Sequence, residues 1–164
     1  MKIARELVMD VPADRVWQVL AQDFATIGEW FSGVDHSKVR ADVEAPQGAK
    51  VGGRICKVPG LGEIQERFTA FDESNKTFAY EVSGMPFFVK AASNSFVVAT
   101  IDGSKTRVSL EAITEVVPVI GWLPLIPMRI QLGRLMGMLL EELKHFVEQG
   151  DIHPRKKEKT PAAQ

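Results

Sequence analysis

The sequence predicts one α+β domain in which a strongly bent antiparallel sheet wraps around a long carboxy-terminal helix. Two observations predict this class. Five apolar-rich segments follow one another between residues 51 and 117, and the separators between them are short and rich in Gly, Pro, Asn and Asp, as in hairpins. The chain then carries apolar residues at helical spacing up to residue 149. Strands and helices segregated in this order place the helices on one side of the sheet.

The amino-terminal third is expected to form a strand and two short helices. Apolar and charged residues alternate in "KIARELVMDV", which is typical of a strand. Pro12 stands next, at the expected start of a helix, where the N–H that proline lacks would have no intrahelical partner. The apolar residues of "PADRVWQVLAQ" gather on one helical face. "FATIGEWF" predicts a second short helix that breaks at Gly28 or ends near Gly33.

The middle of the chain is expected to form an antiparallel meander. Residues 34–50 are polar, with Pro46 and Gly48 in a turn, and part of this segment is a candidate short edge strand. The meander strands are predicted at about 51–58, 62–72, 76–84, 88–101 and 105–117.

One long amphipathic helix is predicted after the proline-rich run. Its apolar face is formed by Leu132, Leu135, Met136, Leu139, Leu140, Leu143, Phe146 and Val147. Gly150 is a natural helix stop. Residues 150–164 have no apolar periodicity and a cluster of lysines, so we expect a single domain over 1–149 and a disordered polar tail beyond it.

Composition and charge argue against several classes of function. Twenty Lys and Arg balance 21 Asp and Glu, so no overall positive field would gather nucleic acid, and we expect no such partner. The single cysteine, Cys56, cannot form an intramolecular disulfide, and no Cys or His spacing indicates a metal site. No motif implies a cofactor. Charged residues interrupt the amino terminus where a signal peptide would be apolar, so a cytoplasmic location is expected.

Several local patterns resemble one known superfamily. They are "VPADRVWQVLAQDFATIGEWF", "VGGR" at 51–54, "ERFTAFDESNKTFAYEVSG" at 66–84, and the long helix that follows Pro118 to Pro127. Over residues 1–149 the chain resembles the Bet v 1-like or START-like helix-grip superfamily, also called the SRPBCC or polyketide cyclase/dehydrase-like group. The resemblance implies a helix-grip fold with an apolar cavity between sheet and helix. Members include lipid carriers, hormone receptors and cyclase subunits, so the fold alone assigns no chemistry.

Glu66 is a charged residue on an otherwise apolar strand face, because alternation places it between Ile64 and Phe68. In the plant abscisic-acid receptors of the superfamily, a similar strand carries a glutamate that faces the ligand cavity. The resemblance implies the same for Glu66, and Arg54 on the preceding strand is its candidate partner. The alternative is that the sheet bends there and Glu66 reaches solvent or makes a surface pair.

The first hypothesis for function is binding or transport of a hydrophobic small molecule, such as a lipid, isoprenoid or polyketide. Arg54, Glu66 and Tyr80 would supply its few polar contacts. Further candidates to line the cavity, with ordinary core packing as the alternative, are Phe68, Val82, Phe87, Phe96, Trp122, Met128, Leu132, Met136 and Leu140.

Two other hypotheses stay open. The first is an enzyme similar to polyketide cyclases or dehydratases, in which Glu66, with Tyr80 or an inward-facing Glu111, moves a proton. The second is an accessory protein that docks on a membrane or a partner through the apolar segment 116–128. For this segment we favour a lid over the cavity mouth, with a dimer contact and a membrane contact as the alternatives. Both a monomer and a homodimer are therefore compatible with the sequence. The adjacent Asp35 and His36 are expected in a solvated loop.

Overall fold

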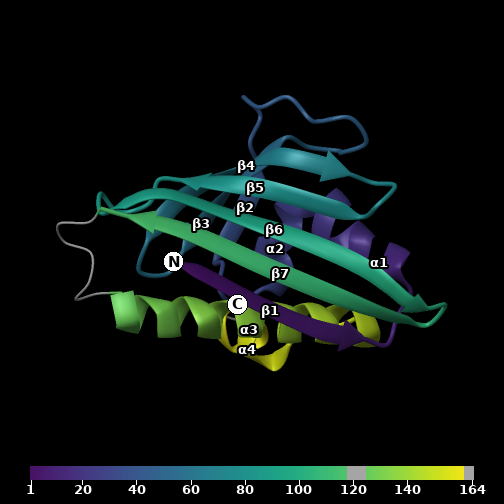
Figure 1. The fold of residues 1–164 in the computed structure, drawn as a ribbon. Coiled ribbons are helices and arrows are strands. Elements are labelled where there is room, and N and C mark those ends of the chain that lie inside the picture. The colour runs from purple at the N-terminus through teal and green to yellow at the C-terminus, as the bar shows by residue number, and fades with distance from the viewer. Residues whose placement is uncertain (118–124, 161–164) are drawn as a thin grey trace.

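The computed structural model describes residues 1–117 and 125–160. Seven antiparallel strands form one sheet in the order β1-β7-β6-β5-β4-β3-β2. The sheet bends around the long helix α3 (Leu125–Gln149), as Figure 1 shows. The predicted fold class is confirmed.

The strands lie close to their predicted positions. Each of the five meander strands begins and ends within two residues of its prediction, and the short edge strand expected within 34–50 is β2. The strands are β1 (Lys2–Met9), β2 (His36–Val39), β3 (Gly53–Val58), β4 (Gly62–Asp72), β5 (Thr77–Ser83), β6 (Val89–Asp102) and β7 (Lys105–Val116). The β3–β4 turn needs glycine at two positions, because Gly60 and Gly62 have φ angles of 79° and 84°.

Short helical segments connect β1 to β2. Helix α1 (Ala13–Trp17) continues into the π-helical turn η1 (Gln18–Gln22), and the 3₁₀ turn η2 (Phe24–Thr26) leads into α2 (Ile27–Trp30). Gly28 lies inside α2 and does not break it. A Cβ atom at this position would come within 2.6 Å of the Ser37 backbone nitrogen, so glycine lets α2 pack directly against β2.

The two ends of the sheet differ. Because successive strands are antiparallel, the β3–β4 turn, the β5–β6 turn and the end of β7 lie at one end, where α3 begins (Figure 1). We call this the open end and define it by residues 59–61, 84–88 and 125–131. Its helical part is poorly covered, since Ile126 is 71% exposed and Ile130 is 51% exposed.

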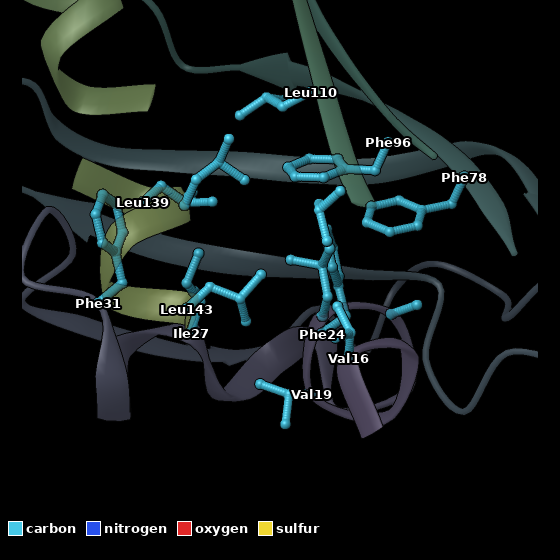
Figure 2. Close-up of a cluster of buried hydrophobic side chains, with 14 of the residues drawn as sticks. Val16, Val19, Phe24, Ile27, Phe31, Phe78, Phe96, Leu110, Leu139 and Leu143 are labelled. Atoms are coloured by element: carbon cyan, nitrogen blue, oxygen red, sulfur yellow. The ribbon is translucent and has the colours of Figure 1, made fainter. Parts of the chain in front are cut away.

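The opposite end of the sheet, which we call the closed end and define by the turns 73–76 and 103–104, lies next to an aromatic part of the core. Figure 2 shows aromatic side chains from the sheet facing α3 and the η2–α2 segment. The rings of Phe78 and Phe96 stack with centroids 4.9 Å apart, and those of Phe24 and Phe68 lie 4.3 Å apart. Leu143 of α3 is fully buried against this cluster. Burial of each such side chain contributes about 1.5–3 kcal/mol to the stability of the fold.

The carboxy-terminal segment differs from the predicted disordered tail. Gly150 ends α3 with a φ of 69°, as expected, but residues Pro154–Lys159 form helix α4. Lys156 Nζ donates a hydrogen bond to the Val34 carbonyl at 2.7 Å, and Lys159 Nζ donates to the Ser32 carbonyl at 2.9 Å. Both acceptors are main-chain oxygens of a loop that is distant in the sequence. The lysine-rich sequence of the tail therefore could not predict these contacts. Residues 161–164 lie outside the described part.

Candidate functional site

Polar side chains cross the concave face of the sheet in two adjacent rows. Strand pairing aligns Arg54 with Glu66 and Glu66 with Val82, so these side chains share one face. One row closer to the closed end, Phe68 pairs with Tyr80 and Tyr80 with Asn94. We call Arg54, Glu66, Tyr80 and Asn94 the polar band.

The centre of the polar band is a buried ion pair. Arg54 Nε donates to Glu66 Oε2, and the two side chains are only 5% and 7% exposed. A second guanidinium nitrogen, Nη1, donates to the Phe24 carbonyl at 2.7 Å. The guanidinium also lies 3.7 Å from the centroid of the Phe24 ring, within range of a cation–π interaction. Glu66 therefore does not reach solvent, and Arg54 is its partner.

The polar band contains one positive and one negative side chain, Arg54 and Glu66, which pair with each other. Burial, the largest single effect, would lower the pKa of Arg54, but the opposing effects of its neighbours, above all the Glu66 carboxylate, together outweigh burial and the pKa is raised. Burial raises the pKa of the Cys56 thiol to about 12. Burial, reinforced by the Glu66 charge, also raises the pKa of Tyr80. The thiol and the phenol are therefore neutral at physiological pH.

The space next to this pair at the closed end is narrow. It measures about 180 Å³ and is too tight at every point for a water molecule. Arg54 and Tyr80 line it together with Leu20, Phe24, Ile27, Phe78, Phe96 and Leu139. On the other side of the polar band, toward the open end, the inward-facing Val82 and Ala92 are only half-buried. Among the described residues, inward-facing apolar side chains that remain partly exposed therefore lie toward the open end.

The predicted lining residues fall into several groups. Those buried in the core are Phe68, Tyr80, Phe96, Met136 and Leu140. Those half-buried on the side of the open end are Val82, Met128 and Leu132. Phe87 does not face the interior, because the β5–β6 turn presents it outward with 83% of its surface exposed. Trp122 and most of the apolar segment 116–128 lie outside the described residues.

Glu111 does not belong to the interior. Its neighbours Leu110 and Ala112 are buried, so Glu111 projects from the opposite, outer face of β7. There it pairs with Lys2 at 2.8 Å. A pair of internal carboxylates formed by Glu66 and Glu111 is therefore excluded by the alternation of side chains along the strand. Asp35 and His36 are exposed, as expected, but His36 is the first residue of β2 and does not lie in a loop.

A second buried carboxylate was not predicted. Glu142 of α3 has no exposed surface, and its two oxygens accept hydrogen bonds from the Ser32 N–H at 2.7 Å and the Ser32 hydroxyl at 2.6 Å. Arg155 of α4 lies 3.3 Å from the same carboxylate. The sequence pattern that could have predicted its burial is helical spacing, because Glu142 stands on the apolar helix face three residues after Leu139 and four before Phe146. The Phe24 carbonyl, a main-chain group, had no such pattern.

Neither a metal site nor a membrane span is evident in residues 1–117 and 125–160. No group of three or more His, Cys, Asp or Glu side chains in these ranges is placed to hold a metal ion. None of the helices described there is both long and apolar enough to cross a bilayer.

Comparison with known families and structures supports the same architecture. The family model described as polyketide cyclase / dehydrase and lipid transport matches residues 1–148. A search of curated proteins found no sequence that matches this chain.

Solved structures with the same fold have low sequence identity. A START superfamily protein from Mycobacterium smegmatis has a TM-score of 0.70 and 14% identity over 92% of this chain and 99% of that one. Norcoclaurine synthase from Thalictrum flavum, in a truncated form, has a TM-score of 0.71 and 16% identity over 91% of this chain and 94% of that one. The di-domain ARO/CYC BexL has a TM-score of 0.70 and 13% identity, over 90% of this chain and 48% of the di-domain protein. These likenesses confirm the helix-grip fold.

Proposed function

Because the chain belongs to the polyketide cyclase / dehydrase and lipid transport family, we propose that it binds a hydrophobic small molecule between the concave face of the sheet and α3. The ligand would be a lipid, an isoprenoid or a polyketide. The observation that carries this proposal is the buried Arg54–Glu66 pair, set among aromatic side chains next to half-buried apolar residues.

The energetics of the pair support a role in binding. Removing two charges from water is costly, and apolar residues of similar volume at such a position are often neutral or stabilising. Stability alone is therefore a weak reason for Arg54 and Glu66 to stand in this core. A few fixed polar groups in an otherwise apolar site are what orient a ligand in most small-molecule pockets.

Binding is better supported than acid–base catalysis. A general acid or base must exchange a proton with the substrate, and Glu66 is already engaged by Arg54. The second carboxylate of the enzyme hypothesis, Glu111, projects from the other face of the sheet. The raised pKa of Tyr80 keeps its phenol protonated at neutral pH, so no phenolate is available as a base. We therefore place the cyclase- or dehydratase-like activity second.

The experiment is native mass spectrometry of the full-length protein, followed by solvent extraction and identification of any copurified molecule. Two adjacent alanines of β6 give a matched pair of variants. Ala92 faces inward opposite Val82, whereas Ala91 is exposed. Ala92→Phe should fill the space and release the ligand, while Ala91→Phe should keep it.

The proposal also holds if the protein purifies empty but binds the apolar fluorophore N-phenyl-1-naphthylamine in a manner that Ala92→Phe weakens and Ala91→Phe does not. Absence of both a copurified molecule and fluorophore binding would overturn it. Equal binding by the two variants would overturn the proposed location.

A further inference from the structure

We propose that the ligand presents an uncharged polar head, with a hydroxyl or carbonyl oxygen, to the polar band, and that the Arg54–Glu66 pair discriminates against carboxylate and ammonium heads. This inference rests on the proposed function and adds the chemical class of the ligand. It is carried by the charge balance and hydrogen bonds of the pair.

The charges of the polar band already cancel. The guanidinium of Arg54 is held by the Glu66 carboxylate and by the Phe24 carbonyl. The other titratable groups of this region, Cys56 and Tyr80, add no charge, since both are buried in their neutral forms. The described residues on the concave face of β3, β4 and β5 therefore offer a ligand no unpaired charge.

An anionic head would be unfavourable in this environment. Its oxygens could reach Nη2 of Arg54, but the Glu66 carboxylate already neutralises that guanidinium and would repel a second anion. To gain a counter-ion of its own, the anion would have to displace Glu66 and leave that carboxylate buried without a partner. Uncompensated charge in a low-dielectric interior is strongly disfavoured. A cationic head would find no free counter-ion either, because the Glu66 carboxylate is already paired with Arg54. The Phe24 ring, which could make a cation–π interaction, already contacts the Arg54 guanidinium.

A neutral oxygen, in contrast, can be accommodated without breaking the pair. The third guanidinium nitrogen of Arg54, Nη2, makes no hydrogen bond to the described residues, and guanidinium groups have five N–H donors. The Tyr80 hydroxyl and the half-buried Asn94 amide, which face each other across β5 and β6, add further donors and acceptors. A carbonyl or hydroxyl oxygen suits this set, since it needs hydrogen bonds and no counter-charge.

The test uses probe pairs with the same body and different heads, namely dodecan-1-ol with dodecanoate and 2-naphthol with 2-naphthoate. Binding to the full-length protein at neutral pH is measured by displacement of N-phenyl-1-naphthylamine and by calorimetry. In at least one pair, the neutral member should bind at least about tenfold more tightly than the carboxylate, a difference of about 1.4 kcal/mol.

The role of the pair is tested by Glu66→Gln. The variant frees the Arg54 charge, so the affinity for the carboxylate member should rise about tenfold relative to its neutral counterpart. The matched control is Glu81→Gln, because the Arg67–Glu81 pair stands on the outer face of the neighbouring strands with side chains that are 50% and 48% exposed. This control should leave the preference unchanged.

The outcomes separate the two proposals. If a carboxylate binds as well as its neutral counterpart or better in every pair that binds, the inference is wrong and the proposed function stands. If Glu66→Gln folds and leaves the preference unchanged, the assignment to the ion pair is wrong. If no probe binds to the wild-type protein, the inference fails, and the proposed function fails with it only when no molecule copurifies and N-phenyl-1-naphthylamine does not bind either. Should Glu66→Gln not fold, the wild-type comparison alone decides.

Discussion

Breaking the buried ion pair should destabilise the protein far more than breaking its neighbour on the outer face. Glu66→Gln removes the counter-charge of the buried Arg54 guanidinium and leaves it only neutral acceptors, the Phe24 carbonyl and the amide oxygen of the new side chain. Removal of one partner of a buried pair costs about 3–5 kcal/mol. In a domain of this size each kcal/mol lowers Tm by about 2–4 °C, so the expected decrease is about 6–20 °C.

The matched control is Glu81→Gln in the half-exposed Arg67–Glu81 pair. Exposed pairs contribute about 0–1 kcal/mol, because water and salt screen them and both side chains lose conformational entropy. The double replacement Arg54→Met with Glu66→Leu should recover most of the stability lost in Glu66→Gln, since no uncompensated charge remains.

Urea unfolding followed by the fluorescence of the buried Trp17 and Trp30 provides the free energies. The reasoning is refuted if Glu66→Gln loses no more stability than Glu81→Gln. It is also refuted if the double replacement is as unstable as the single one, because the loss would then come from packing and not from charge.

Three further predictions concern the rest of the core. Burial raises the pKa of the Cys56 thiol from 9.0 to about 12. As the pH rises, the thiol therefore loses its proton in the unfolded chain before it does so in the folded protein. The stability that the neutral thiol contributes should be complete below pH 9.0 and be lost as the pH rises toward about 12. Urea unfolding across this range should show a shallower loss for Cys56→Ala, and an equal slope would contradict the burial effect. Glu142→Ala should cost about 3 kcal/mol or more, since two hydrogen bonds to a buried carboxylate are lost, and exposed Glu141→Ala should cost much less in the same assay. Lys156→Met removes the hydrogen bond to the Val34 carbonyl and should speed amide hydrogen exchange in residues 31–35. The control is Lys157→Met, because Lys157 pairs with Asp151, and it should leave that exchange unchanged. Equal effects of the two variants would show that α4 does not anchor this loop through Lys156.

The position of Glu66 illustrates how far sequence reasoning reached. Alternation placed it on an apolar face, and short turns placed Arg54 on the adjacent strand, which the register confirms. The same reasoning left the inward face of the last strand undecided, because Glu111 and its neighbours alternate without a clear apolar side. Only the pairing of β7 with β1 and β6 resolved it.

The amino-acid sequence by itself determined the element order, the turns and the long helix, because these depend on periodicity and on the local preferences of Gly and Pro. Only the tertiary structure decided which charges are buried and what they contact. Arg54 is held by a carbonyl of η2, Glu142 by Ser32, and α4 by the carbonyls of Ser32 and Val34. Such partners are distant in the chain, and main-chain groups are the same at every residue, so no local pattern identifies them.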